Sequence, residues 1–234
     1  GSWVYFRLPE SLDPENRQPI APRTIARNMG TAISDRSVIG YIFGSTLVFG
    51  ALFGFINSSQ QLISEGFGRP DVFPIVFGIC AGSMAFASWS NSRIVERFGA
   101  RRVSHTAVFA FIGVASLQVY FAFSHDETLW EFVPLMAVNM ALLGFIGSNF
   151  GSIAMTPFFH IAGAASSIQT FVRMTSAALL GAVIGQAFDG TARPLALALL
   201  ASGIACLLLV LFSEKGRLFA PPQAVNRYPS GMRN

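Results

Sequence analysis

A single arginine lies deep within one hydrophobic stretch of this sequence, and its polar neighbours form the clearest candidate for a site. The stretch runs from Gly163 to Asp189, and Arg173 is its only charged residue before that aspartate. An arginine at the centre of a bilayer costs about 3 kcal/mol on insertion scales, so it should face protein or a water-filled cavity. At 100° per residue, one helix face carries Ser166, Gln169, Thr170, Arg173 and Ser176. Either this stripe lines a path for a substrate or ion, or Arg173 binds backbone carbonyls or snorkels and only holds helices together.

The composition indicates an integral membrane protein that positions this stripe within a helical bundle. Hydrophobic residues make up 52% of the chain and charged residues 12%, about half the charged share of soluble domains. Six apolar segments are long enough to cross a bilayer, namely 37–62, 72–90, 103–124, 129–150, 163–188 and 193–213. We therefore expect an all-α membrane protein with six transmembrane helices in residues 37–213. Residues 25–34 are expected to form a short surface helix.

The positive charges predict the orientation of the six helices. Of the 16 lysine and arginine residues, only Arg69 and Arg193 flank one set of helix ends, and Arg173 lies within a helix. The others, including Arg93, Arg97, Arg101 and Arg102, cluster at the opposite set of ends, which the positive-inside rule places in the cytoplasm. Both termini are then cytoplasmic. The net charge of +4 thus reflects membrane topology rather than nucleic-acid binding.

No pattern for covalent chemistry is present. His105, His125 and His160 are too scattered for a metal site, and Cys80 and Cys206 lie inside apolar segments, where packing is the expected role. Neither a serine–histidine–acid arrangement nor a phosphate-binding loop occurs. We expect no enzyme activity, no catalytic residue, no metal and no cofactor.

Small residues recur at four-residue spacing in the apolar segments and predict close helix packing. The pairs are Gly40/Gly44, Gly50/Gly54, Gly78/Gly82, Gly147/Gly151 and Gly181/Gly185.

The most specific pattern lies between the second and third apolar segments, where residues 92–102 read SRIVERFGARR. Gly99 would allow a tight reversal of the chain. Glu96 would lie near Arg97, Arg101 and Arg102 and could exchange ion-pair partners as helices move. The alternative is that these arginines only hold the loop in the cytoplasm and meet anionic lipid.

This loop resembles the G-x-x-x-D-R-x-G-x-R-R loop of the major facilitator superfamily, with Ser92 in place of the glycine and Glu96 in place of the aspartate. The stretches LPESL at 8–12, NSRIVERFGARR at 91–102 and PFFHIAGAASS at 157–167 are similar to the Bcr/CflA-type drug-resistance branch. The resemblance covers residues 3–213. It identifies the loop residues Ser92, Glu96, Arg97, Gly99, Arg101 and Arg102 as a conformational switch.

The resemblance implies the C-terminal half of a twelve-helix secondary transporter, built from two inverted three-helix repeats. Residues 1–36 would then be the end of a preceding helix and a cytoplasmic linker, residues 37–213 the transmembrane bundle, and 214–234 a cytoplasmic tail. The first, second, fourth and fifth helices would line a substrate cavity. Candidate substrate contacts are Arg173, Gln169, Asn57, Gln61, Asn139 and Asn149. The alternative for each amide is an interhelical hydrogen bond worth about 0.6–2 kcal/mol.

Arg173 departs from the branch, where an uncharged polar residue is expected. A cation at this depth suits an anionic substrate, or a carboxylate partner on another helix, better than a hydrophobic or cationic drug.

The expected function is secondary active transport in a bacterial inner membrane, with efflux of drugs or small metabolites. No Asp or Glu lies well inside an apolar segment, so proton coupling would need an acid in a missing N-terminal half. The expected partners are the lipid bilayer, a small-molecule substrate and that N-terminal half or a second copy, but no nucleic acid. The alternative is a non-transporting six-helix remnant that serves as a structural subunit of a larger membrane complex.

Overall fold

The computed structural model describes residues 21–125 and 127–219, with the backbone but not the side chains of Phe159 and His160. The predicted end of a preceding helix and most of the predicted tail therefore lie outside the described residues, as does the His160 side chain. Within the described residues the chain is α-helical and contains no strand. Six helices are long and apolar enough to cross a membrane, as predicted.

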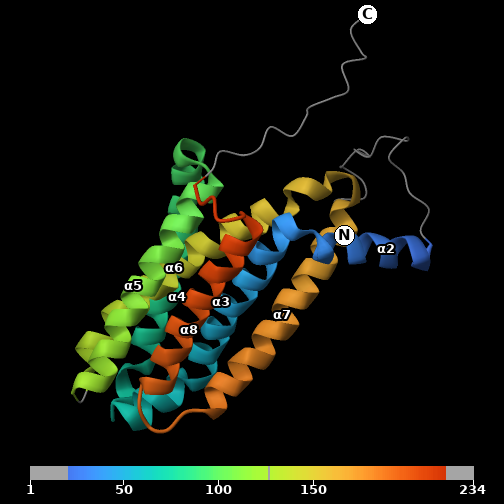
Figure 1. Cartoon of the computed structure of the whole chain (residues 1–234). Coiled ribbons are helices and arrows are strands. Elements are labelled where there is room, and N and C mark those ends of the chain that lie inside the picture. The colour runs from blue at the N-terminus through green and yellow to red at the C-terminus, as the bar shows by residue number, and fades with distance from the viewer. Residues whose placement is uncertain (1–20, 126, 220–234) are drawn as a thin grey trace, which may run out of the picture.

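These helices and their short extensions follow one another with brief connections (Figure 1). Helix α3 spans Arg36–Gln61 and continues into a π-helical turn at Leu62–Gly66. A 3-10 turn at Pro70–Val72 precedes α4, Phe73–Phe98, and α5 spans Ala100–Ser124. Helix α6, Leu129–Met155, is joined by a 3-10 turn at Thr156–Ile161 to α7, Ala162–Gln186. Helix α8 spans Arg193–Ser213.

Local side-chain chemistry sets several of these boundaries. Asp35 precedes α3 and its carboxylate accepts a hydrogen bond from the Ser37 amide at 2.8 Å, which satisfies a free donor of the first turn. Thr128 and Glu131 form a capping box at the start of α6. Gly99 has a φ of +82°, a conformation that favours glycine, and it separates α4 from α5. The predicted tight reversal at Gly99 is thus confirmed, with both flanking helices longer than their apolar segments.

The first three membrane-crossing helices, α3 to α5, and the last three, α6 to α8, have equivalent packing partners. Helix α3 packs along α7 and α8, and α6 packs along α4 and α5. The pairs α3–α6 and α5–α8 join the two sets. Exchanging α3 with α6, α4 with α7 and α5 with α8 reproduces this pattern. Because each set has three membrane-crossing helices, the second begins on the other side of the membrane, as expected for inverted repeats.

This packing leaves one side of α3 and α6 open. Helices α5 and α8 cover the back of the α3–α6 pair, whereas α7 and α4 flank it and have no substantial contact with each other in the described chain. We call the side of α3 and α6 between α7 and α4 the open face. Ser45, Phe49 and Ile56 lie on the sector of α3 that belongs to this face, between its α6 and α7 contacts.

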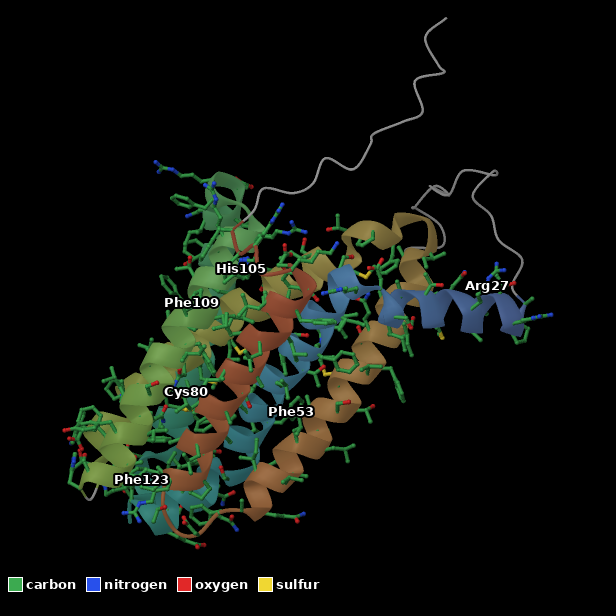
Figure 2. The ribbon with its side chains drawn as sticks, in the orientation of Figure 1. Arg27, Phe53, Cys80, His105, Phe109 and Phe123 are labelled. Carbon is green, nitrogen blue, oxygen red and sulfur yellow. The ribbon has the colours of Figure 1, made fainter. Side chains whose placement is uncertain are left out.

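The two ends of the bundle differ in charge. The turn between α4 and α5, the start of α3 and the residues after α8 lie at one end, which we call the basic end, and Figure 1 shows them together at the top. Helix α2, Pro22–Ser34, runs sideways from this end beyond α7 (Figure 1), and Figure 2 shows Arg27 towards its outer end. The predicted surface helix is therefore confirmed. We call the other end, with Arg69 and Arg193, the acidic end because Glu65, Asp71, Glu127, Glu131 and Asp189 lie there.

Most of the predicted glycine steps bring helices together. A Cβ atom added to Gly50 would lie 2.8 Å from Leu180 Cβ on α7, and one added to Gly44 would lie 3.1 Å from Cys206 Sγ on α8. Phe53, labelled in Figure 2, packs on Gly181 between α3 and α7. The Gly78/Gly82 pair of α4 is different, because nothing described lies within 4 Å of an added Cβ at either position. Those two glycines make no packing step with the described residues of this chain.

Candidate functional site

Arg173 occupies the middle of α7 and lies beside the open face. Its guanidinium carbon is 5.3 Å from the centre of the Phe49 ring on α3, within the range of a cation–π interaction. The Nε atom is buried and has no hydrogen-bond partner among the described residues. The ion pairs of the described chain do not include Arg173. A cation that is half removed from water and unpaired is unusual, because desolvated charges in proteins are normally paired.

Small residues on α6 make room for this arrangement. A Cβ atom added to Gly147 would lie 2.8 Å from the Phe49 ring, and one added to Gly151 would lie 3.9 Å from Nη1 of Arg173. The Gly147/Gly151 step therefore seats an aromatic ring and a guanidinium rather than a second backbone.

A cavity of about 140 Å³ opens in front of Arg173. It lies between the basic-end halves of α3, α6 and α7, and its polar lining consists of Tyr41, Ser45, Ser166, Gln169, Thr170 and Arg173. Four members of the polar stripe expected from the sequence thus meet at one cavity, which we call the Arg173 cavity. The fifth, Ser176, lies in a separate apolar groove between α3, α7 and α8. Helix α4, also expected to line the site, contributes no residue to the cavity.

The predicted amide contacts divide into two groups. Gln169 reaches the cavity, but its Nε2 also donates to the Ala154 carbonyl oxygen at 3.2 Å, which ties α7 to α6. Asn57 and Gln61 are exposed on α3 towards the acidic end and are not part of the Arg173 cavity.

Asn139 and Asn149 are buried inside the bundle and connect helices. Asn149 Nδ2 donates to Asn91 Oδ1 at 2.7 Å, which joins α6 to α4. Asn139 Nδ2 donates to Gln118 Oε1 at 2.8 Å, which joins α6 to α5. Both bonds are of the interhelical kind named above as the alternative to substrate contact.

The loop expected to act as a switch has a different ion pair from the one anticipated. Glu96 is exposed and takes part in no ion pair within the described residues. Arg101 instead places Nε 3.4 Å from Oε1 of Glu214, just after α8. Arg97 lies over the Phe98 ring at 5.4 Å, Ser92 donates to the Trp89 carbonyl oxygen, and Arg102 borders an apolar groove between α4, α5 and α6.

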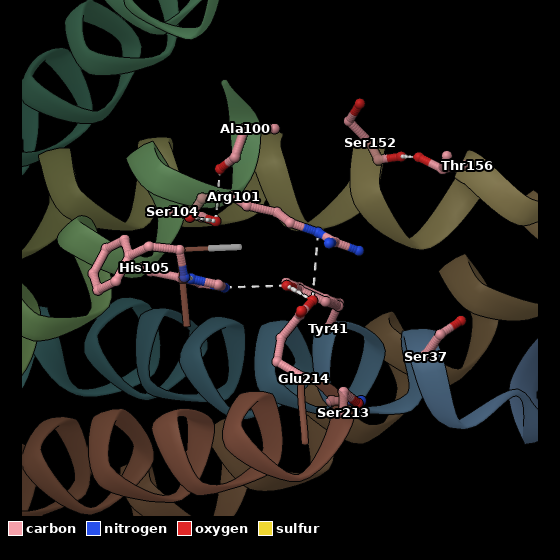
Figure 3. Close-up of polar contacts among 12 residues, drawn as sticks. Ser37, Tyr41, Ala100, Arg101, Ser104, His105, Ser152, Thr156, Ser213 and Glu214 are labelled. Atoms are coloured by element: carbon pink, nitrogen blue, oxygen red, sulfur yellow. Dashed lines mark hydrogen bonds and ion pairs between the residues drawn. The ribbon is translucent and has the colours of Figure 1, made fainter. Parts of the chain in front are cut away.

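Glu214 is the centre of a buried polar cluster at the basic end (Figure 3). The Tyr41 hydroxyl donates to Glu214 Oε1 at 2.5 Å and lies 3.1 Å from Nε2 of His105. Since that hydroxyl donates to the carboxylate, it accepts from Nε2–H of His105. The other ring nitrogen, Nδ1, then accepts from the Phe219 amide at 3.3 Å. This cluster of Arg101, Tyr41, His105 and Glu214 links α3, α5 and the end of α8.

Sequence reasoning missed this cluster, because Tyr41 and Glu214 are far in the chain from Arg101 and His105, and only Arg101 belongs to the loop motif. The available signal was a lone carboxylate at Glu214, directly after an apolar helix and on the same end as Arg101.

A second cavity, of about 200 Å³, lies at the acidic end. Both carboxylate oxygens of Glu127 are buried there and have no hydrogen-bond partner among the described residues. Burial, with a smaller contribution from the nearby Glu131 charge, raises the pKa of Glu127 to about 7. Glu127 therefore holds a proton more readily than an exposed glutamate does.

The sequence is similar to bacterial proteins that are named for drug resistance or transport. The chain is 29% identical over 193 residues to a bicyclomycin resistance protein homologue of Haemophilus influenzae. It is 25% identical over 187 residues to the uncharacterized MFS-type transporter YdgK of Bacillus subtilis, and 27% identical over 221 residues to the multidrug resistance protein MdtL of Escherichia coli.

The three alignments cover 82%, 78% and 90% of this chain but 48%, 45% and 54% of the relatives. The chain thus spans about half the length of the curated relatives it matches. No protein-family model matches the chain, and no solved structure matches it significantly.

The relatives are named for transport or drug resistance and not for catalysis, which supports a role other than that of an enzyme. Together with the six membrane-crossing helices, they show that this chain is an integral membrane protein related to the drug-resistance transporters of the major facilitator superfamily.

Proposed function

We propose that this chain forms half of a secondary active transporter that exports drugs or small metabolites across a bacterial inner membrane. The names of its relatives, among them a bicyclomycin resistance protein homologue and a multidrug resistance protein, support efflux. The distribution of arginine and lysine supports a cytoplasmic basic end, with both termini on that side.

The observation that carries this proposal is the unpaired Arg173 beside an open face. Secondary transporters of this architecture hold substrate near the middle of the membrane, between two six-helix units. The open face is the side of the bundle on which a second unit would complete such a site. That unit would be an N-terminal half or a second copy of this chain, and rocking between the units would give alternating access.

Proton coupling would require a carboxylate that can exchange a proton inside the membrane. The described carboxylates lie at the ends of the bundle and not in the middle of its helices. If export is driven by protons, we expect the titrating acid to lie in an N-terminal half, because a second copy of this chain would add no carboxylate in the middle of a described helix.

Drug accumulation in cells tests the proposal. A strain that lacks its own efflux pumps would produce the full 234-residue chain, with an empty vector as the reference. Bicyclomycin and a panel of other antibiotics would be measured for growth inhibition and for intracellular concentration. If a second copy of the chain completes the site, we expect the chain alone to lower accumulation of at least one compound, and Arg173→Gln to abolish the effect.

Arg217→Gln is the matched control, because Arg217 is exposed at the basic end and outside the cavity. It should export like the unsubstituted chain. Unchanged accumulation of every compound, together with co-purification in fixed ratio with respiratory or photosynthetic proteins, would contradict transport and favour the structural-subunit alternative.

A further inference from the structure

The hydrogen-bonding groups around Arg173 define which chemical group the cavity accepts. The Tyr41 hydroxyl donates to Glu214, the Ser45 hydroxyl donates to the Ile42 carbonyl oxygen, and Gln169 Nε2 donates to Ala154. These donors are already used within the protein. The donors that remain all come from α7.

Those remaining donors form a row along one side of the cavity. Ser166, Thr170 and Arg173 follow one another at spacings of four and three residues, which places them on successive turns of one helix face. All three line the cavity. The Ser166 and Thr170 hydroxyls and the guanidinium make no hydrogen bond within the described part of the chain. The Arg173 Nε is also buried, and the guanidinium carries a full positive charge.

No carboxylate of the described residues forms an ion pair with Arg173. The Glu214 carboxylate, which accepts a hydrogen bond from the lining residue Tyr41, is already paired with Arg101. A desolvated guanidinium without a counter-ion is costly, and a carboxylate is its best partner, because two parallel N–H···O bonds form between them. The site is therefore complementary to an anion and unfavourable for a cation.

The size of the cavity limits how much of a ligand it holds. The cavity has a volume of about 140 Å³. Pockets that enclose a whole drug-sized molecule measure roughly 300–1,000 Å³. The cavity thus fits one acidic group with the atoms next to it, while the rest of the molecule extends over the open face towards Phe49 and Ile56.

We propose that the Arg173 cavity binds the carboxylate of small amphipathic organic acids, which reach it from the basic end and lie with their apolar part on the open face. This inference rests on the proposed transport function for its biological role, but the binding itself is independent of transport. Ser166 and Thr170 orient the second carboxylate oxygen, and the Phe49 ring holds the guanidinium in place.

Binding of benzoate and of its neutral isostere benzamide tests the proposal. Both would be titrated against the purified full chain in lipid nanodiscs at neutral pH, with saturation-transfer NMR as the readout. We expect benzoate to bind at least about tenfold more tightly, since a hydrogen bond to a charged group is worth more than a neutral one. Arg173→Gln should remove the preference, Arg173→Lys should keep part of it, and Arg217→Gln should leave it unchanged.

Equal affinity for the two probes in the unsubstituted chain would overturn the proposal, as would a benzoate preference that survives Arg173→Gln. Thermal melting of each variant identifies proteins that have not folded, and only variants that melt cooperatively are compared. Benzoate binding that depends on Arg173 without any drug export would contradict the proposed function alone. Export of neutral drugs without benzoate binding would contradict the present inference alone.

Discussion

Replacing Gly40 by alanine should weaken the bundle more than the same change at any exposed glycine. Gly40 lies in the second turn of α3, directly against the end of α8. An added Cβ would collide with the backbone carbonyl oxygen of Leu209 and would lie 2.6 Å from Ser213 Oγ. The Ser213 hydroxyl accepts from the Gly40 amide at 2.7 Å and donates to the Arg36 carbonyl oxygen at 2.8 Å, so two hydrogen bonds are disturbed by the same methyl group.

The expected loss of stability follows from competing contributions. Overpacking costs about 1–3 kcal/mol, and the upper part of that range applies because a backbone atom cannot move aside as a side chain can. Disturbed buried hydrogen bonds add about 0.5–1.5 kcal/mol each. The better helix propensity of alanine returns roughly 0.5–1 kcal/mol. We therefore expect Gly40→Ala to lower the free energy of unfolding by about 2–5 kcal/mol.

Gly78→Ala is the matched control, because it makes the same change in α4 at a site with nothing described within 4 Å. It should be neutral or stabilising by up to about 1 kcal/mol. Unfolding by sodium dodecyl sulfate in mixed micelles, followed by circular dichroism, measures both variants. Equal unfolding midpoints for the two variants would refute the close approach of α3 and α8 at Gly40.

Three further predictions concern polar groups. Glu214→Gln should lower the melting temperature by removing the ion pair with Arg101, and an unchanged melting temperature would contradict the described cluster. Because the pKa of Glu127 is raised from its usual 4.5 to about 7, its contribution to stability is present below about pH 4.5 and is lost as the pH rises through 7. The melting temperature should therefore fall over that interval, and Glu127→Gln should flatten the profile, whereas an identical profile in the variant would show that other groups cause it. Asn149→Ala should cost about 1–2 kcal/mol by leaving Asn91 unpaired, and additive losses in the double Ala variant would contradict the direct bond.

The sequence predicted the six helices well because their lengths and apolar composition are local properties. It also predicted the reversal at Gly99, where one residue type determines the backbone conformation. The helix ends were predicted less well. Helix α4 continues to Phe98, beyond its apolar segment, because arginines and glutamates favour helices as strongly as leucine does.

The site was only partly accessible to sequence reasoning. Helical spacing brought Ser166, Gln169, Thr170 and Arg173 to one face, but it could not show where that face ends, and Ser176 lies in another groove. The pairing of Asn149 with Asn91 joins residues far apart in the chain. Such contacts depend on how helices pack, and spacing within one helix carries no information about them.

Labelling of a cysteine at position 170 tests most directly whether Arg173 faces an aqueous, anion-accepting cavity. Thr170→Cys would be treated with the anionic thiol reagent sulfonatoethyl methanethiosulfonate. The reaction would be run in membrane vesicles whose outer surface exposes the basic end of the bundle. The buried Cys80 and Cys206 supply the background, and Leu179→Cys, at a position 65% exposed in this structure on an apolar surface, supplies the comparison.

Because only a hydrated thiolate reacts, position 170 should label at least about ten times faster than position 179. Benzoate should slow that labelling, and Arg173→Gln should lower the rate for the anionic reagent by removing the local positive potential. Labelling at position 170 as slow as at position 179 would contradict the account, because it would place the polar stripe of α7 in lipid or in tightly packed protein.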